Sequence, residues 1–202
     1  HQLFLSMTHK IQFKKAEEYS FDGISLGMNF KDDILPRPPF NVFCDDDPID
    51  DRSRLMVVYT AKDCRMTRFP EDTSVLMYFP DYPEDKFDQS LEALAVIHGK
   101  YFDTRSDFPI KVNSPLEDYD ILGESLITSI PMRTRRKQKT NVDIMRYPDD
   151  ISIITIDVDG GKLIGGFVVG KMPDNMEMES WRSILKVYRT FAPDKIKALF
   201  KK

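Results

Sequence analysis

An apolar run that contains several glycines, residues 151–170, constrains the fold of this chain more than any other stretch. Residues 151–158 and 163–169 are rich in β-branched and other apolar side chains, and Asp159-Gly160-Gly161 between them is a turn signal. The run therefore predicts a buried β-hairpin at the centre of a sheet. Gly165-Gly166 inside the second apolar segment indicates a β-bulge or close packing against a helix.

Two segments have the spacing of amphipathic helices. Residues 175–191 carry apolar side chains at helical intervals, which predicts a helix that covers the sheet. Residues 81–98 begin with Asp81-Tyr82-Pro83-Glu84, a helix-start signal, and are followed by Gly99 as a stop. The apolar positions are Trp181, Ile184, Leu185, Tyr188 and Phe191 in the first segment and Phe87, Leu91, Leu94 and Ala95 in the second.

Shorter β-branched and aromatic runs predict further strands. These runs are residues 3–13, 19–30, 55–60, 75–79, 122–132 and 140–147. Pro131 restricts its strand to a sheet edge or to a strand end, because proline has no backbone N–H to donate.

The order of these elements predicts an α+β fold, a mostly antiparallel β-sheet with two main helices packed on it. With 202 residues, of which 41% are hydrophobic, the chain is long enough to bury one sizeable core, so we expect a single domain over residues 1–202. The layout of its C-terminal part resembles the α/β/α sandwiches of the PsbP and Mog1 type, which also end with a hairpin and a helix. This resemblance implies an architecture and carries no activity or residue role.

Two opposite charge runs are the most distinctive surface features. The basic turn, residues 133–139, carries the positive residues Arg133, Arg135, Arg136, Lys137 and Lys139. The acidic run, residues 45–51, begins with Asp45, Asp46 and Asp47. Three interpretations of the basic turn remain open: a solvated hairpin tip, a site for an anion or acidic partner, and an intramolecular partner of the acidic run.

We expect the chain to be a non-catalytic binding or adaptor protein, of inhibitor or immunity type, that recognises another protein of complementary charge. A net charge of −4 and the absence of aromatic residues within the basic turn argue against nucleic acid as the partner. We predict no cofactor, because the glycines match neither the P-loop pattern nor G-x-G-x-x-G. No apolar stretch is long enough for a membrane span, and the oligomeric state is left open.

An alternative is a small metalloprotein or hydrolase-type enzyme centred on His98. Asp157, Asp159, Cys64 and His1 are its candidate helper groups. A shared proton relay or ligand set requires these groups to lie within about 10 Å of His98. The competing interpretation is a structural histidine near the end of the predicted helix.

The sequence begins with His1 rather than methionine, which indicates either a processed terminus or added residues before Met7. A processed terminus slightly favours an extracytoplasmic location, periplasmic or secreted. Cys44 and Cys64 would then be able to form a disulfide bond, and otherwise we expect two buried thiols.

Overall fold

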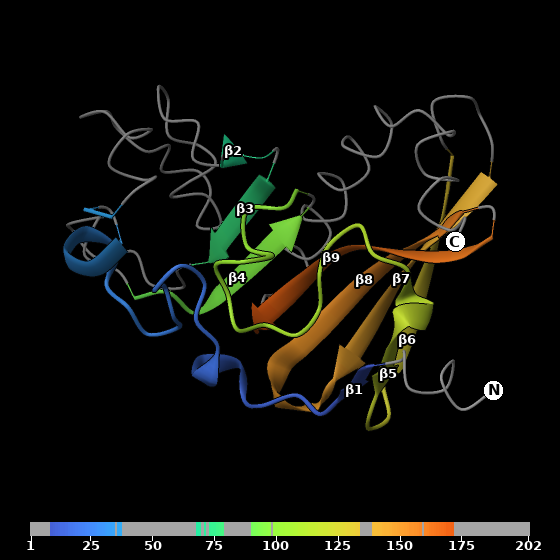
Figure 1. The fold of residues 1–202 in the computed structure, drawn as a ribbon, viewed down its shortest axis with the longest axis horizontal. Coiled ribbons are helices and arrows are strands. Elements are labelled where there is room, and N and C mark those ends of the chain that lie inside the picture. Colours follow the sequence, from blue (N-terminus) through green and yellow to red (C-terminus); the bar gives the residue numbers. More distant parts are fainter. Residues whose placement is uncertain are drawn as a thin grey trace.

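Seven strands form one sheet in the order β2-β3-β4-β9-β8-β7-β6, and every neighbouring pair is antiparallel (Figure 1). The computed structural model describes residues 9–34, 36–37, 68–69, 71, 73–78, 90–97, 99–133, 139–158 and 160–171. The strands of the sheet are β2 (Arg68–Phe69), β3 (Thr73–Tyr78), β4 (Ala93–Ile97), β6 (Leu126–Arg133), β7 (Lys139–Tyr147), β8 (Ile151–Val158) and β9 (Gly161–Gly170). A separate parallel pair consists of β1 (His9–Ile11) and β5 (Tyr119–Ile121).

The predicted hairpin of residues 151–170 is confirmed as β8 and β9 near the middle of the sheet. The predicted bulge is confirmed as well. Ile154 pairs with Gly166, but the next residue, Thr155, pairs with Ile164, so Gly165 is the extra residue. Side chains alternate between the two faces of a strand. The extra residue therefore places the side chains of residues 161–164 on the face opposite to the one that uninterrupted alternation would give them.

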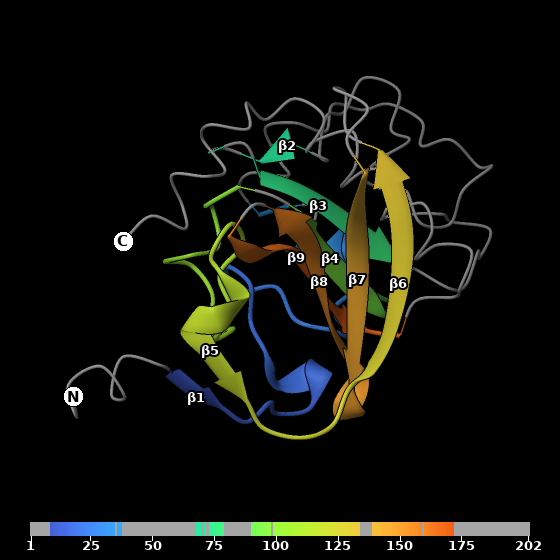
Figure 2. The same cartoon turned by 90° about the vertical axis from the view of Figure 1, so that its right-hand side faces the viewer.

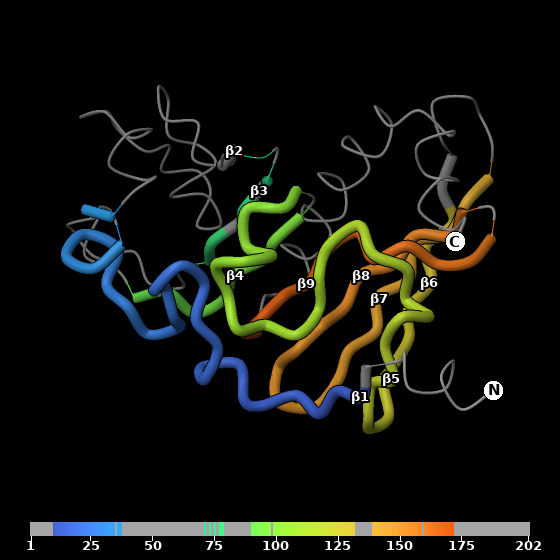
Figure 3. Tube along the Cα trace, in the orientation of Figure 1, coloured from blue at the N-terminus to red at the C-terminus, as the bar shows by residue number. Residues whose placement is uncertain are grey.

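One face of the sheet packs against two long connecting segments, residues 11–34 and 99–121, which cross in front of it (Figures 1 and 3). The core there is aromatic. The Phe108 and Phe167 rings stack with their centroids 4.2 Å apart, and Phe21 stacks on Phe167 at 5.7 Å. Phe167 comes from β9, so these contacts join the central hairpin to both connecting segments.

The opposite face of the central strands is buried too. Its buried side chains include Ala95, Ile97, Val142, Ile144, Ile154, Ile156 and Val168. All five residues of β4 and the first six of β8 are buried in consecutive order. Strands that are covered on both faces have continuous apolar sequences instead of alternating ones.

The helix predicted for residues 81–98 is wrong over Ala93–Ile97, which form β4 between β3 and β9. Gly99 does not end a helix. It has a φ of 88° directly after β4, and a Cβ atom at this position would overlap Thr73 in β3. A run of apolar residues without a polar face can be buried on both sides at no desolvation cost. It therefore fits a central strand of the sheet as well as a helix.

The two main helices of the predicted fold are absent from the residues that the structure describes. Four short helical elements of three to five residues occur there: η1 (Ala16–Glu18), η2 (Phe30–Ile34), η4 (Leu116–Asp118) and η5 (Pro148–Asp150). Residues 175–191, the second predicted helix, lie outside the described residues. The part of the fold prediction that is confirmed is the mostly antiparallel sheet.

The strand predicted for residues 19–30 is also wrong. Phe21 and Ile24 exchange backbone hydrogen bonds of 2.8 and 2.9 Å across a tight turn, and Asp22 within that turn has a φ of 53°. The side chains of Tyr19, Phe21 and Ile24 are buried in the core. Their apolar spacing therefore arises from the packing of an irregular segment onto the sheet.

The remaining strand predictions fare better. The strands predicted at 75–79, 122–132 and 140–147 are present as β3, β6 and β7. Among the described strands β6 lies at one edge of the sheet, which is one of the two alternatives that Pro131 predicted. Of the strand predicted at 3–13, residues 9–11 form β1 and residues 12 and 13 are not strand. Residues 3–8 and the strand predicted at 55–60 lie outside the described part of the chain.

Candidate functional site

Four neighbouring strands bring a set of polar side chains together at one end of the core. We call Ser129, Asp143, Asp157 and Lys162 the polar cluster. The Lys162 ammonium donates to Asp143 Oδ2 and, over 2.6 Å, to Asp157 Oδ1. Ser129 Oγ donates to Asp143 Oδ1 over 2.6 Å. One residue comes from each of β6, β7, β8 and β9, so the cluster ties the outer half of the sheet together.

The strand register explains how this cluster forms. Ser129 pairs with Asp143, and Asp157 pairs with Lys162, so each pair shares one face of the sheet. The Gly165 bulge then sets which face Lys162 occupies. With the bulge, Lys162 lies on the same face as Phe167, which is the face of the aromatic core; without it, Lys162 would lie on the opposite face.

The electrostatics of the cluster favour its charged form. Burial raises the pKa of Asp143, but the hydrogen bonds from Lys162 and Ser129 and the charge of Lys162 outweigh burial and hold this pKa below its usual value. Burial lowers the pKa of Lys162, but the bonds and charges of Asp143 and Asp157 prevail and raise it. A lysine held protonated in this way is a poor nucleophile, so the cluster acts as an ion-pair network.

Thr155 is the buried neighbour of this network. It pairs with Asp143 in the register and is fully buried. Among the described residues, its Oγ1 is the buried side-chain oxygen that has no hydrogen-bond partner. Thr140, by contrast, donates from its hydroxyl to the Asp157 carbonyl oxygen over 2.6 Å. Apart from Thr155 Oγ1, the polar side chains named at this end of the sheet are thus bonded to one another or to the backbone.

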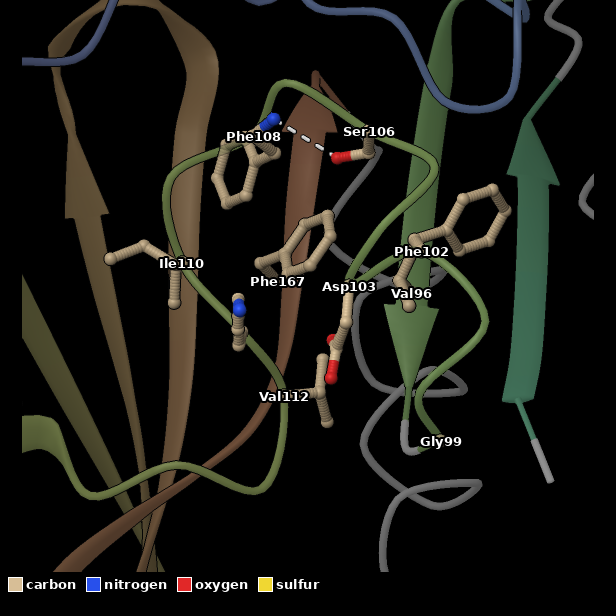
Figure 4. Close-up of a pocket in the computed structure, with 10 residues that line it drawn as sticks. Val96, Gly99, Phe102, Asp103, Ser106, Phe108, Ile110, Val112 and Phe167 are labelled. Atoms are coloured by element: carbon tan, nitrogen blue, oxygen red, sulfur yellow. Dashed lines mark hydrogen bonds between the residues drawn. The ribbon is translucent and has the colours of Figure 1, made fainter. Parts of the chain in front are cut away.

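A small cavity lies between the connecting segment 99–112 and strands β4 and β9 (Figure 4). Its volume is about 10 Å³, which is room for about one water molecule. Val96, Phe102 and Phe167 form much of its apolar wall, and the polar side chain of Asp103 lines it as well. Burial raises the pKa of Asp103, against the opposing charges of Lys111 and Lys100. The cavity is too small for a substrate or a cofactor.

Among the strands that the structure describes, β6 ends the sheet on one side (Figure 2), as β2 does on the other. The first half of β6 is exposed on both faces: Leu126 is 78% exposed and Ile127 58%, and Thr128 and Ser129 are exposed too. Large apolar side chains on an outer strand are unusual, because such strands are normally protected against pairing with other chains. We call the side of Leu126–Arg133 that faces away from β7 the β6 edge.

The structure describes the two ends of the basic turn. Arg133 is the last residue of β6, Lys139 is the first of β7, and the two are register partners. The turn therefore connects two adjacent antiparallel strands, as the sequence predicted. Arg135, Arg136 and Lys137 lie outside the described residues, as do Asp45, Asp46 and Asp47 of the acidic run. Pairing between the two charge runs stays a prediction.

Most residues of the alternative site centred on His98 lie outside the part of the chain that the structure describes. His1, Cys64, His98 and Asp159 lie outside the described residues, as does Cys44. Asp157, the member that is described, is engaged by Lys162. Its carboxylate serves the polar cluster, so it gives no support to a site centred on His98.

Sequence reasoning missed three members of the polar cluster: Ser129, Asp143 and Lys162. A signal was present, because Asp143 lies between the apolar residues Val142 and Ile144, and Lys162 directly precedes Leu163 and Ile164. A charged residue within a buried strand calls for a partner of opposite charge. Finding that partner required the strand register and the position of the bulge.

Within the described part of the chain, no helix is both long enough and apolar enough to cross a membrane. The same residues include no group of three or more histidine, cysteine, aspartate or glutamate side chains placed to hold a metal ion. No model of a known protein family matches this chain, and no curated protein or solved structure matches it either.

Proposed function

We propose that the chain is a non-catalytic binding protein, of adaptor, inhibitor or immunity type, that engages an acidic protein partner. Its contact surface is the basic turn, residues 133–139, together with the neighbouring β6 edge. The observation that carries this proposal is that the turn follows directly from an outer strand whose apolar side chains Leu126 and Ile127 are exposed. The same outer strand thus offers apolar contact area at its start and leads into the positive charge at its end.

The charge of the turn suits recognition better than stability. An exposed ion pair contributes little to the free energy of folding, whereas clustered positive charge accelerates association with an acidic surface and selects against basic partners. Lys139, at the start of β7, is exposed. The net charge of the whole chain is −4, so this positive surface is local and directs the partner to one side of the molecule.

Charge reversal in the turn tests the proposal. The double variant R135E/R136E should weaken the partner's affinity at least about tenfold, equivalent to about 1.4 kcal/mol, and should flatten its dependence on salt. The matched control is K14E/K15E, which makes the same change in net charge at two exposed lysines in another part of the chain. Affinity purification from the native extract identifies the partner, and titration calorimetry at several salt concentrations then gives the affinity.

Two results would contradict the proposal. One is an unchanged affinity for R135E/R136E, and the other is an equal loss with K14E/K15E. The second result would mean that overall charge, and not the basic turn, governs association.

A further inference from the structure

We infer that two copies of this chain pair through the start of β6, in an antiparallel dimer whose two-fold axis passes between the two Leu126 residues. The paired segment is residues 124–128 of each copy, and the structure describes all of them. The dimer goes beyond the proposed function, because it gives the β6 edge a second occupant. Leu126 and Ile127 belong to both surfaces, so the dimer and the complex with an acidic partner exclude each other.

Exposed apolar side chains are concentrated at this place. In the described part of the chain, the large apolar side chains that are exposed are those of Leu122 (49%), Leu126 (78%) and Ile127 (58%). None of the described strands pairs with the side of β6 that faces away from β7. An open strand with exposed apolar side chains is a template for pairing with another chain. A second copy presents the same strand, so one two-fold contact covers both edges.

Pro131 indicates which backbone groups of β6 face outward. A proline in an edge strand is tolerated where its nitrogen faces away from the neighbouring strand. Because backbone groups alternate in direction along a strand, those of Ile127 also face outward, and those of Leu126 face β7. Ser125, just before β6, hydrogen-bonds to Tyr147 of β7 and continues the same alternation. The outward backbone groups at the start of β6 are therefore those of Ser125 and Ile127.

Two-fold pairing centred on Leu126 uses these groups. Residues that lie opposite each other in an antiparallel pair must both face outward or both face inward, and this register meets that condition. Ser125 of each copy lies opposite Ile127 of the other, so their N–H and carbonyl groups bond across the interface. Leu126 packs against Leu126 on one face of the joined sheet. On the other face, the two Ile127 side chains are diagonal neighbours.

Charge complementarity selects this register. Within one copy, Arg146 is the register partner of Leu126 and donates to Thr128 Oγ1 over 3.1 Å. In the dimer, the exposed Glu124 of the second copy lies opposite Thr128, and its carboxylate is therefore beside the Arg146 guanidinium. Symmetry repeats this contact. Two Glu124–Arg146 ion pairs thus flank the two Leu126 side chains.

Neighbouring registers satisfy these groups less well. A pair centred one residue earlier would set Glu124 opposite Leu126, and a pair centred one residue later would set it opposite Ile130. Each places a carboxylate against an apolar side chain. Pairs centred further along β6 bring Pro131 into the paired segment, where its missing N–H leaves a carbonyl oxygen of the other copy without a donor. The pair centred on Leu126 avoids both costs.

Sedimentation equilibrium and hydrogen exchange test the dimer on the full chain. The interface is small, so we expect a Kd of about 10 μM, measured between about 1 and 200 μM protein. Over this range, exchange at the Ser125 and Ile127 amides should slow at least about threefold, as the fraction of monomer falls. The amides of Leu126 and Thr128 face β7 and should not change. A chain that stays monomeric, or a dimer without this alternation, overturns the inference.

Charge exchange tests the register. Glu124→Arg and Arg146→Glu should each weaken dimerisation about tenfold, because two repulsive contacts replace two attractive ones, and E124R/R146E should return to within about threefold of the original chain. The matched control is Glu117→Arg, the same charge change at an exposed residue of η4, which should leave the Kd unaltered. Additive losses in E124R/R146E, or an equal loss in the control, would overturn this register.

Leu126→Lys tests the axis. The variant puts two like charges next to each other, and the side chain that it replaces is 78% exposed, so the fold does not depend on it. We expect this variant to be monomeric at about 200 μM. A dimer of unaltered affinity would show that the two-fold axis lies elsewhere.

Failure of the dimer is distinguishable from failure of the proposed function. If the chain is monomeric and R135E/R136E weakens the native partner, the proposed function stands and the dimer is overturned. If the dimer forms and R135E/R136E leaves the partner's affinity unchanged, the dimer stands and the proposed function fails.

Discussion

Lys162 shows how one side chain holds four strands in register. It is bonded to Asp143 and Asp157, and Asp143 is bonded in turn to Ser129, so the loss of its ammonium group would leave a buried carboxylate without its cation. Removing one partner of a fully buried ion pair costs about 3–5 kcal/mol. Solvent reduces this cost here, because 40% of the Lys162 side chain is exposed.

We therefore expect Lys162→Met to lower the free energy of unfolding by about 2 kcal/mol. Urea denaturation followed by circular dichroism measures the change. Lys171→Met, at an exposed position just after β9, is the control and should lie within about 0.5 kcal/mol of the unaltered chain. A loss no larger than that of the control would mean that the network is not a source of stability.

The same network predicts how stability depends on pH. The folded-state pKa of Asp143 is depressed, so its contribution is present above the unfolded value of about 3.9 and is lost as the pH falls through the folded value. The folded-state pKa of Lys162 is raised, so its contribution is present below about 10.4, the unfolded value, and is lost as the pH rises through the folded value.

Asp143→Asn tests how stability depends on pH in the acidic range. The difference in free energy of unfolding between the original chain and this variant should be largest near neutral pH and should shrink below about pH 4. Urea midpoints collected from pH 2 to pH 7 give the comparison. A difference that stays constant over this range would show that the ionisation of Asp143 is not linked to folding.

At the scale of elements, the Gly165 bulge decides which side chains of β9 enter the aromatic core. Deleting Gly165 would restore strict alternation and move Lys162 and Ile164 to the opposite face of the sheet, which is buried between β8 and β9. We expect the deletion to cost about 3 kcal/mol or more, because it breaks the ion-pair network and places a lysine against apolar side chains.

Thermal unfolding measures this effect, with Gly165→Ala as the comparison that keeps the residue count of β9. The substitution should be milder than the deletion. A deletion variant as stable as the substitution variant would show that the bulge does not set the facing of Lys162.

The elements also show what sequence patterns can and cannot predict. The β8–β9 hairpin was predictable because long β-branched runs around a turn signal have one common structural use. Its bulge and the edge position of β6 were each one of the two alternatives that the paired glycines and Pro131 allowed. The segment around β4 was not predictable. Leu91, Leu94 and Ala95 fit helical spacing, but their neighbours Val96 and Ile97 are apolar as well, and a run without a polar face fits a helix and a buried strand equally.

For the whole molecule, the sequence predicted one part of the candidate surface and missed another. The basic turn was predictable from its charges alone, and Pro131 predicted either an outer strand or a strand end, of which the outer strand is observed. The exposure of Leu126 and Ile127 was not predictable, because apolar residues in a strand are normally buried. The polar cluster was not predictable either. Asp143 and Lys162 are 19 residues apart in the sequence, and only the pairing of β7, β8 and β9 brings them into contact. The single domain over residues 1–202 stays a prediction.

The position of Pro131 has a consequence for how β6 could pair with further chains. An open strand that carries Leu126 and Ile127 is a template on which further chains could stack without limit. A proline toward the far end of the strand removes one donor from that template. We therefore expect Pro131 to disfavour the stacking of further chains on β6.

Replacing Pro131 with valine tests this role. The variant regains the missing donor and a strand-forming side chain, so we expect faster aggregation at equal protein concentration, with little change in the free energy of unfolding. Light scattering over time, together with thioflavin fluorescence, records the growth of stacked sheets. If Pro131→Val stays as monodisperse as the original chain, Pro131 does not protect β6 against the stacking of further chains.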